Sequence, residues 1–304
     1  MYVLRICFAL LVLCVVLAVG RRRGHSRRGS GPPLPSPAHL CPFGGSLDTE
    51  MDPNDDGNSG RLRIPRFPFF GRRYRSLYVN TNGLISFNQP NADYTPEWFP
   101  QTRDILIAPY WADADTRLNE GRVYYRESKG VPCITKLSEI VQKAFKNDFQ
   151  ATWLFFATWH RVTFYRRDNT ASFRPPVNTF QTILVTNGRE SYVVFNYGDI
   201  AWTTGEASGG DENGLGGTPA EVGFNAGDGT RYYTQFGSLT PDIIDIRTKT
   251  NCNTRGRFVF RVDGREILSP QPTLYGYFRG DVSRSRSAMR GKPTGKKPEA
   301  PAAA

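Results

Sequence analysis

Apolar and polar residues alternate along many short stretches of the chain, as expected for β-strands with one buried face. Two of these stretches, residues 77–87 and 180–195, each contain an Asn-Gly pair. Asn-Gly tolerates the positive φ angles of a tight turn, so the sequence predicts two β-hairpins. Further strands are predicted over residues 105–111, 122–125, 153–165, 221–224, 232–236 and 257–262.

One stretch has the periodicity of a helix. Leu137, Ile140, Val141, Ala144 and Phe145 follow the spacing i, i+3, i+4, i+7, i+8, which places them on one apolar stripe. Thr135 stands where an N-cap is expected. The predicted fold is mostly β (α+β): an antiparallel β-sandwich or open sheet with one covering helix near residues 136–147.

The charge of the chain is concentrated at its ends. Of 304 residues, 39 are Lys or Arg and 28 are Asp or Glu, a formal charge of +11. Residues 1–40 and 271–304 hold thirteen of the bases and two of the acids, leaving 26 of each sign in residues 41–270. The central region is neutral, so the basicity does not indicate a nucleic-acid partner. The 30 glycines and 22 prolines exclude a coiled coil.

The N-terminus has the features of a secretory signal. Arg5 precedes an apolar run over residues 6–19, and Ala18-Val19-Gly20 supplies the small residues of a cleavage site. The run is short for a bilayer span, so no spanning segment is expected after signal removal. An uncleaved anchor is the alternative, because three arginines follow directly. We predict a signal peptide (1–20), a disordered basic arm (21–40), one domain (41–270) and a disordered basic tail (271–304).

Cysteine usage fits an oxidising compartment. Removal of the signal leaves Cys41, Cys133 and Cys252. Three thiols allow one internal disulfide in any of three pairings and one cysteine left over. Three independent buried thiols are the alternative. Their spacing does not match a zinc site.

Residues 41–266 resemble the NIDO domain, the extracellular module named for nidogen. The resemblance is carried by ordered segments, among them residues 67–71 (FPFFG), 77–87 (LYVNTNGLISF), 108–113 (APYWAD), 202–211 (WTTGEASGGD) and 256–264 (GRFVFRVDG). It implies a secreted or cell-surface protein of the extracellular matrix with a role in cell–matrix adhesion and no catalysis.

We therefore expect a matrix module that binds extracellular matrix or cell-surface proteins, or glycans, through surface loops. The candidate binding loop contains Trp202, Thr203, Thr204 and Asp211, because loops on rigid sheets often carry binding residues. The alternative for this stretch is a tight corner packed under the tryptophan. The rival functions are a carbohydrate-active enzyme and an innate-immunity lectin.

Catalytic patterns are weak. His160 is the only histidine of residues 41–270, and strand alternation places it on one face with Val162 and Phe164, as for a structural residue. Glu97, Asp113, Asp115 and Glu206 offer carboxylates for glycoside hydrolysis, but no spacing singles out a pair. We predict that the chain is not an enzyme.

Calcium is the one cofactor that the sequence raises. Residues 52–57 (DPNDDG) match the start of an EF-hand loop, yet Arg63 stands where the bidentate Glu is required. A solvated acidic connector is the preferred interpretation there. The second candidate set is Asp113 and Asp115 with Asp211, Glu212 and Asn213. Its alternative is a glycine-rich turn whose polar side chains bond their own backbone.

The basic ends suggest an extracellular polyanion. Arg21, Arg22 and Arg23 in the arm, with Lys296 and Lys297 in the tail, are candidate contacts for sulfated glycosaminoglycans. A solvated linker is the alternative.

Overall fold

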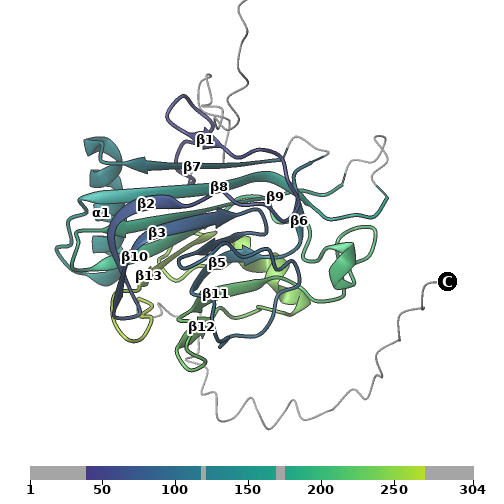
Figure 1. The fold of residues 1–304 in the computed structure, drawn as a ribbon. Coiled ribbons are helices and arrows are strands. Elements are labelled where there is room, and N and C mark those ends of the chain that lie inside the picture. Colours follow the sequence, from purple (N-terminus) through teal and green to yellow (C-terminus); the bar gives the residue numbers. More distant parts are fainter. Residues whose placement is uncertain (1–38, 118–120, 169–174, 271–304) are drawn as a thin grey trace, which may run out of the picture.

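The computed structural model describes residues 39–117, 121–168 and 175–270, which form two antiparallel β-sheets packed face to face (Figure 1). The seven-stranded sheet has the order β1-β7-β8-β9-β10-β13, with β6 also paired to β8. Its strands are β1 (Thr49–Glu50), β6 (Ala114–Asp115), β7 (Arg122–Ser128), β8 (Trp153–Phe164), β9 (Asn178–Thr186), β10 (Ser191–Tyr197) and β13 (Arg257–Arg261).

The six-stranded sheet has the order β12-β11-β5-β4-β3-β2. Its strands are β2 (Leu62–Phe69), β3 (Arg72–Asn80), β4 (Leu84–Ser86), β5 (Leu106–Trp111), β11 (Glu221–Asn225) and β12 (Tyr232–Thr234). Every strand pair of the described residues is antiparallel. Two short 3₁₀ helices, η1 (Glu206–Ser208) and η2 (Pro241–Thr248), lie in the connections after β10 and β12.

The main core lies between the sheets. Phe195 of β10 and Phe260 of β13 meet Phe224 of β11, with ring centroids 5.3 Å and 5.1 Å away. Burial of such aromatic side chains contributes roughly 1.5–3 kcal/mol each. The mostly-β fold class with two sheets is therefore confirmed, in its sandwich form.

Helix α1 (Val131–Phe145) covers the outer face of the seven-stranded sheet. Its Leu137 and Val141 are fully buried and share a cluster with Leu154 and Ile183 of β8 and β9. The helix begins about five residues earlier than predicted, because Pro132 occupies its first turn after the N-cap Gly130. Thr135 is inside the helix, so its predicted capping role is wrong.

Both predicted hairpins are present. The turn between β3 and β4 places Gly83 at φ 76°, and the turn between β9 and β10 places Gly188 at φ 88°. Each remaining predicted strand coincides with an observed one. Strands β1, β2 and β6 were not predicted: β1 and β6 have two residues each, and the prolines and arginines of β2 hide the alternation of its apolar residues.

The predicted alternation through His160 is wrong beyond that residue. A register shift lies between Trp159 and Val162 of β8, and Arg161 adopts a positive φ of 51°. This bulge adds one residue to the strand and reverses which face the following side chains occupy. Val162 and Phe164 consequently join Trp159 in the inter-sheet core.

Candidate functional site

The stretch that begins at Trp202 starts as a packed corner, the alternative that the sequence offered. Trp202 is 1% exposed, and its indole Nε1 donates to the Val162 carbonyl at 2.9 Å. The Tyr110 hydroxyl donates to the Trp202 carbonyl at 2.9 Å, and the Asn178 Oδ1 accepts from the Trp202 amide. Thr203 and Thr204 are also buried. These three side chains therefore shape the corner, and the predicted recognition role is corrected for them.

Asp211 and its neighbours form an exposed turn. The Asp211 Oδ1 accepts hydrogen bonds from the backbone amides of Asn213 and Leu215, each at 2.9 Å. This is the self-bonded turn that the sequence offered as the alternative to calcium binding. Within the described residues, Asp113 gathers with Asp55 and Asp56 rather than with Asp211 or Glu212. The predicted ligand set is thus corrected.

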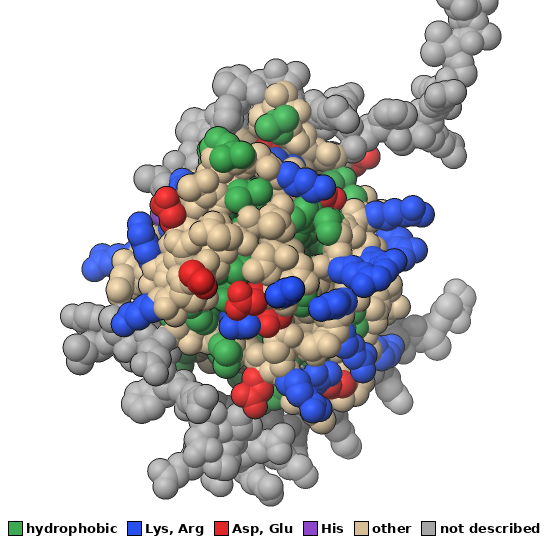
Figure 2. Space-filling model, turned by 90° about the vertical axis from the view of Figure 1, so that its left-hand side faces the viewer, with side chains coloured by type: hydrophobic (Ala, Val, Ile, Leu, Met, Phe, Trp, Pro, Cys, Tyr) green, Lys and Arg blue, Asp and Glu red, His purple; other side chains and the backbone are tan. Residues whose placement is uncertain are grey.

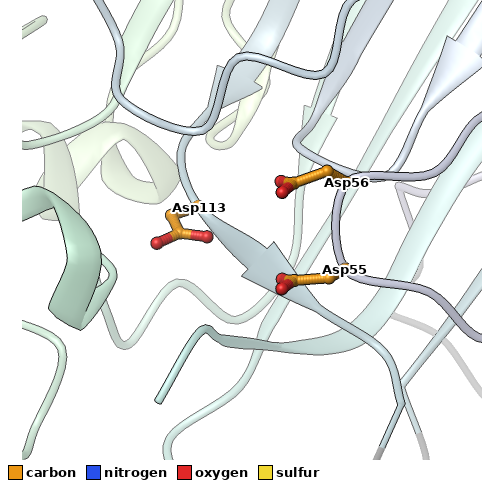
Figure 3. Close-up of side chains that lie close together, drawn as sticks. All are labelled: Asp55, Asp56 and Asp113. Carbon is orange, nitrogen blue, oxygen red and sulfur yellow. The ribbon is translucent and has the colours of Figure 1, made fainter. Parts of the chain in front are cut away.

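The acidic cluster consists of Asp55, Asp56 and Asp113, which come from the two stretches that the sequence treated separately (Figure 3). One carboxylate oxygen of each residue lies within 4.8 Å of the others. Asp55 and Asp56 lie in the connection from β1 to β2, and Asp113 lies between β5 and β6. The hairpin turn after β3 brings the two segments together.

Asp115 and Arg117 border the acidic cluster. The Arg117 guanidinium donates from Nε and Nη2 to the two Asp115 oxygens at 3.0 Å and 2.8 Å, and Nη2 lies 3.0 Å from Asp55 Oδ2. Both oxygens of Asp115 are therefore paired with Arg117. Arg117 neutralises one charge next to the cluster while the remaining carboxylates stay close to one another.

The pKa values reflect this crowding of carboxylates. Burial raises the pKa of Asp113 to about 8, and the charges of Asp55, Asp56 and Asp115 add to the effect. Burial, with Asp115 and Asp56, raises the pKa of Asp55 to about 6, although Arg117 opposes the shift. The folded protein therefore disfavours ionisation of both groups.

The other candidate catalytic residues have structural contacts. His160 packs against Phe43, with ring centroids 5.1 Å apart. Glu206 accepts from the Arg166 Nε at 3.3 Å and from the Arg167 amide at 2.9 Å. Glu97 is exposed and 3.5 Å from the Gln101 amide nitrogen.

The three cysteines are free thiols in this structure. Cys41 is buried, and Cys133 and Cys252 pack against the same cluster beneath α1. No disulfide bond joins them in this structure, but all three lie in one cluster, so the single disulfide in any of three pairings stays a prediction. Burial raises the pKa of the Cys41 and Cys252 thiols.

A second charged feature, which we call the basic hairpin, was missed in the sequence because the central region is neutral on average. It comprises the strands β2 and β3 and the residue before them, and it carries six exposed arginines: Arg61, Arg63, Arg66, Arg72, Arg73 and Arg75. Residues 57–92 contain no Asp or Glu. None of the six arginines forms an ion pair with a carboxylate of the described residues. Figure 2 shows Lys and Arg side chains gathered along one side of the molecule.

A groove of about 480 Å³ lies at the start of the basic hairpin. Arg61 and Arg63 line one part of it, and Leu47, Tyr125 and Phe155 line other parts. Leu47 is 83% exposed. The groove combines cationic groups with apolar surface.

Several predictions fall outside the described residues: the signal peptide, the basic arm with Arg21, Arg22 and Arg23, and the tail with Lys296 and Lys297. Within the described ranges, no helix has the length and apolar character needed to cross a membrane.

The described residues thus define a β-sandwich module with charged surface features. Residues 75–264 match the family described as "NIDO: Nidogen-like domain", and the chain belongs to this family. The resemblance inferred from the sequence is confirmed.

Similar proteins support the assignment. Alpha-tectorin of Mus musculus is 46% identical over 226 residues, which cover 72% of this chain and 10% of that protein. Nidogen-1 of Mus musculus is 33% identical over 259 residues, covering 80% of this chain and 20% of the relative. Nidogen of Drosophila melanogaster is 33% identical over 250 residues, which cover 76% of this chain and 18% of that protein.

The chain spans a tenth to a fifth of the length of these relatives. No solved structure matches it with statistical significance. The family places this protein among the modules of secreted extracellular matrix proteins.

Proposed function

We propose that this protein is a non-catalytic matrix adhesion or assembly module that binds sulfated glycosaminoglycans on its basic hairpin. The observation that carries the proposal is the set of six exposed arginines without an intervening acid. Through such polyanions the module would associate with matrix or cell-surface proteins that carry them.

The chemistry of arginine favours this partner. A guanidinium group presents a rigid fork of donors that matches sulfate and carboxylate oxygens two at a time. Several such contacts release counterions from a linear polyanion, so binding weakens steeply as salt increases. The groove beside Arg61 and Arg63 offers Tyr125 as an additional surface for a sugar ring.

The non-catalytic part of the proposal is supported by the contacts of the candidate residues. Glu206 and Asp115 are paired with arginines, and His160 packs on an aromatic ring. Turnover of any glycoside that is abolished by Glu206→Gln or Asp113→Asn would overturn it. A lectin would instead bind neutral glycans with little dependence on salt.

The test is heparin-affinity chromatography of the secreted chain with a salt gradient. The triple variant Arg72→Ala/Arg73→Ala/Arg75→Ala removes three charges from β3. Its matched control, Arg189→Ala/Arg247→Ala/Arg255→Ala, removes three exposed arginines elsewhere. We expect the β3 variant to elute at a clearly lower salt concentration than the control.

Equal elution of the two triple variants would show that net charge alone determines retention and would overturn the site. Absence of wild-type retention at low salt would overturn the polyanion partner. Desulfated heparin provides a ligand control, because it retains the sugar backbone without the sulfate groups.

A further inference from the structure

We propose that Asp55, Asp56 and Asp113 bind a calcium ion. The structure brings these carboxylates together from two segments separated by β2 to β5. Figure 3 shows the three side chains directed toward a common space, with Asp113 facing the other two. Carboxylate oxygens are the ligands that hard divalent cations prefer.

The kind of ligand set favours calcium over magnesium. The three carboxylate oxygens lie within 4.8 Å of one another and come from two loop segments. Ca²⁺ accepts irregular geometry and six to eight oxygen ligands at about 2.3–2.6 Å, whereas Mg²⁺ requires a near-ideal octahedron at about 2.0–2.1 Å and usually keeps several waters.

Two buried oxygen atoms provide evidence independent of the clustering. The Asp113 Oδ2 and the Asp55 Oδ1 are both inaccessible to solvent and accept no hydrogen bond from the described residues. Asp113 as a whole is 2% exposed. A buried carboxylate without a partner is costly, because water has been removed and nothing replaces it. A cation bound between the carboxyl groups of Asp113 and Asp55 supplies a counter-charge to both residues.

The local charge also calls for a cation. Arg117 is the positive charge that contacts this region among the described residues, and it is already shared between Asp115 and Asp55. Its contact with Asp55 uses Oδ2 and leaves Oδ1 unpaired. Arg117 forms no ion pair with Asp56 or Asp113, so neither of these two carboxyl groups has a cationic contact among the described residues.

The turn after β3 holds the two acidic segments in place. The Asn82 Nδ2 donates to Asp56 Oδ1 at 2.7 Å, and the Asn82 Oδ1 accepts from the Ala114 amide at 2.9 Å. Thr81 donates to the Gly57 carbonyl from its amide at 2.9 Å and from its hydroxyl at 3.1 Å. Asn82 thus links the neighbour of Asp113 to Asp56 itself, as expected for a preorganised site.

The space around Asp113 is also shaped for a carboxyl group. A Cβ atom on residue 205 would lie 2.3 Å from the Asp113 Oδ2, so glycine is required there by the close approach. The backbone φ of Gly205 is −79°, which any residue adopts. Gly205 is present because Asp113 occupies the space beside it.

The test is calcium titration of the full secreted chain after removal of metal with a chelator. Isothermal titration with CaCl₂ is compared with MgCl₂, and thermal unfolding is followed with and without CaCl₂. We expect one calcium ion per chain with a Kd of about 10⁻⁴–10⁻³ M, the range of extracellular modules, and a higher Tm in calcium.

Asp113→Asn and Asp56→Asn are expected to weaken calcium binding at least tenfold. Asp211→Asn is the matched control, because Asp211 is exposed and outside the acidic cluster. We expect this control to bind calcium as the wild type does. The metal-free Asp113→Asn chain should unfold at or above the wild-type Tm, since the variant removes a buried unpaired carboxylate.

An unchanged wild-type Tm together with no titration heat at 10 mM CaCl₂ would overturn the site. Wild-type affinity in both Asp113→Asn and Asp56→Asn would also overturn it, as would tighter binding of Mg²⁺ than of Ca²⁺. Heparin retention of the Asp113→Asn chain is measured in parallel. It should be unchanged, because the basic hairpin does not include the acidic cluster.

Discussion

The Asp113 carboxyl group occupies the space that a side chain at position 205 would fill: an added Cβ would lie 2.3 Å from Oδ2, 2.5 Å from Cβ and 2.6 Å from Cγ of Asp113. Residue 205 comes directly before the 3₁₀ helix η1, far along the chain from Asp113. This close approach explains why residue 205 is a glycine, although its backbone geometry does not require one.

We predict that Gly205→Ala destabilises the protein by about 1–3 kcal/mol, the usual cost of overpacking a site that cannot expand. Urea unfolding measures the change in free energy. Gly130→Ala is the control, because Gly130 has φ −69° and its added Cβ would meet only Ser128 Oγ at 3.6 Å. We expect the control to change stability by no more than about 0.5 kcal/mol. Equal effects of the two substitutions would contradict the steric argument.

Alanine substitutions in the two hairpin turns distinguish the cost of backbone strain from the cost of a steric clash. Gly188 has φ 88° and open space around its Cα, whereas Gly83 has φ 76° and a Cβ there would lie 1.9 Å from the Tyr110 carbonyl oxygen. Gly188→Ala should therefore cost about 1–2 kcal/mol, the penalty of the left-handed conformation. Gly83→Ala should cost at least about 2 kcal/mol more, since it adds overpacking.

Chemical denaturation of both variants tests this difference. A Gly83→Ala protein as stable as the Gly188→Ala protein would show that the contact between residue 83 and Tyr110 relaxes at little cost.

Glu221 of β11 gives the protein a pH dependence. Its side chain is fully buried, Oε1 accepts from the Thr234 hydroxyl at 2.9 Å, and Oε2 has no partner among the described residues. Burial raises the pKa of Glu221 to about 8, although Thr234 opposes the shift. In the unfolded chain the pKa is near 4.5.

Between about pH 4.5 and pH 8 the unfolded chain releases a proton that native Glu221 keeps. Stability therefore falls as pH rises through this window, by up to about 1.4 kcal/mol per pH unit from this group. We predict that Glu221→Gln removes this slope, so the variant gains stability over the wild type as pH rises toward 8. Unfolding curves between pH 5 and pH 9 measure it, and parallel pH profiles would contradict the prediction.

The cysteines can be tested by alkylation. We expect Cys41 to react slowly with iodoacetamide in the native protein, because its thiol is 2% exposed and burial raises its pKa. Unfolding without a reductant then reports the disulfide expected for a secreted chain: one of the three cysteines should stay reactive and two should not. Mass spectrometry identifies the pair. Labelling of Cys41, Cys133 and Cys252 without reductant would show that all three remain thiols.

Local pattern predicted much of the scaffold. The Asn-Gly turns at Asn82 and Asn187, the strand pattern of β8 and the apolar stripe of α1 each depend on residues close together in sequence. The bulge at Arg161 and the early start of α1 were missed, because they depend on a neighbouring strand and on Pro132. The prediction of Trp202 as a binding residue failed for a similar reason: exposure is a property of packing and not of the residue type.

Local periodicity and ordered motifs encode the antiparallel strands, the hairpin turns, the helix stripe and the membership of the nidogen-like family. The packing of distant segments was needed to show that Asp55 and Asp56 meet Asp113, that Trp202 is buried and that six arginines lie exposed on the basic hairpin. These features arise from contacts between distant segments. Two acidic stretches that look separate in the chain become one cluster because the turn at Asn82 is hydrogen-bonded to both.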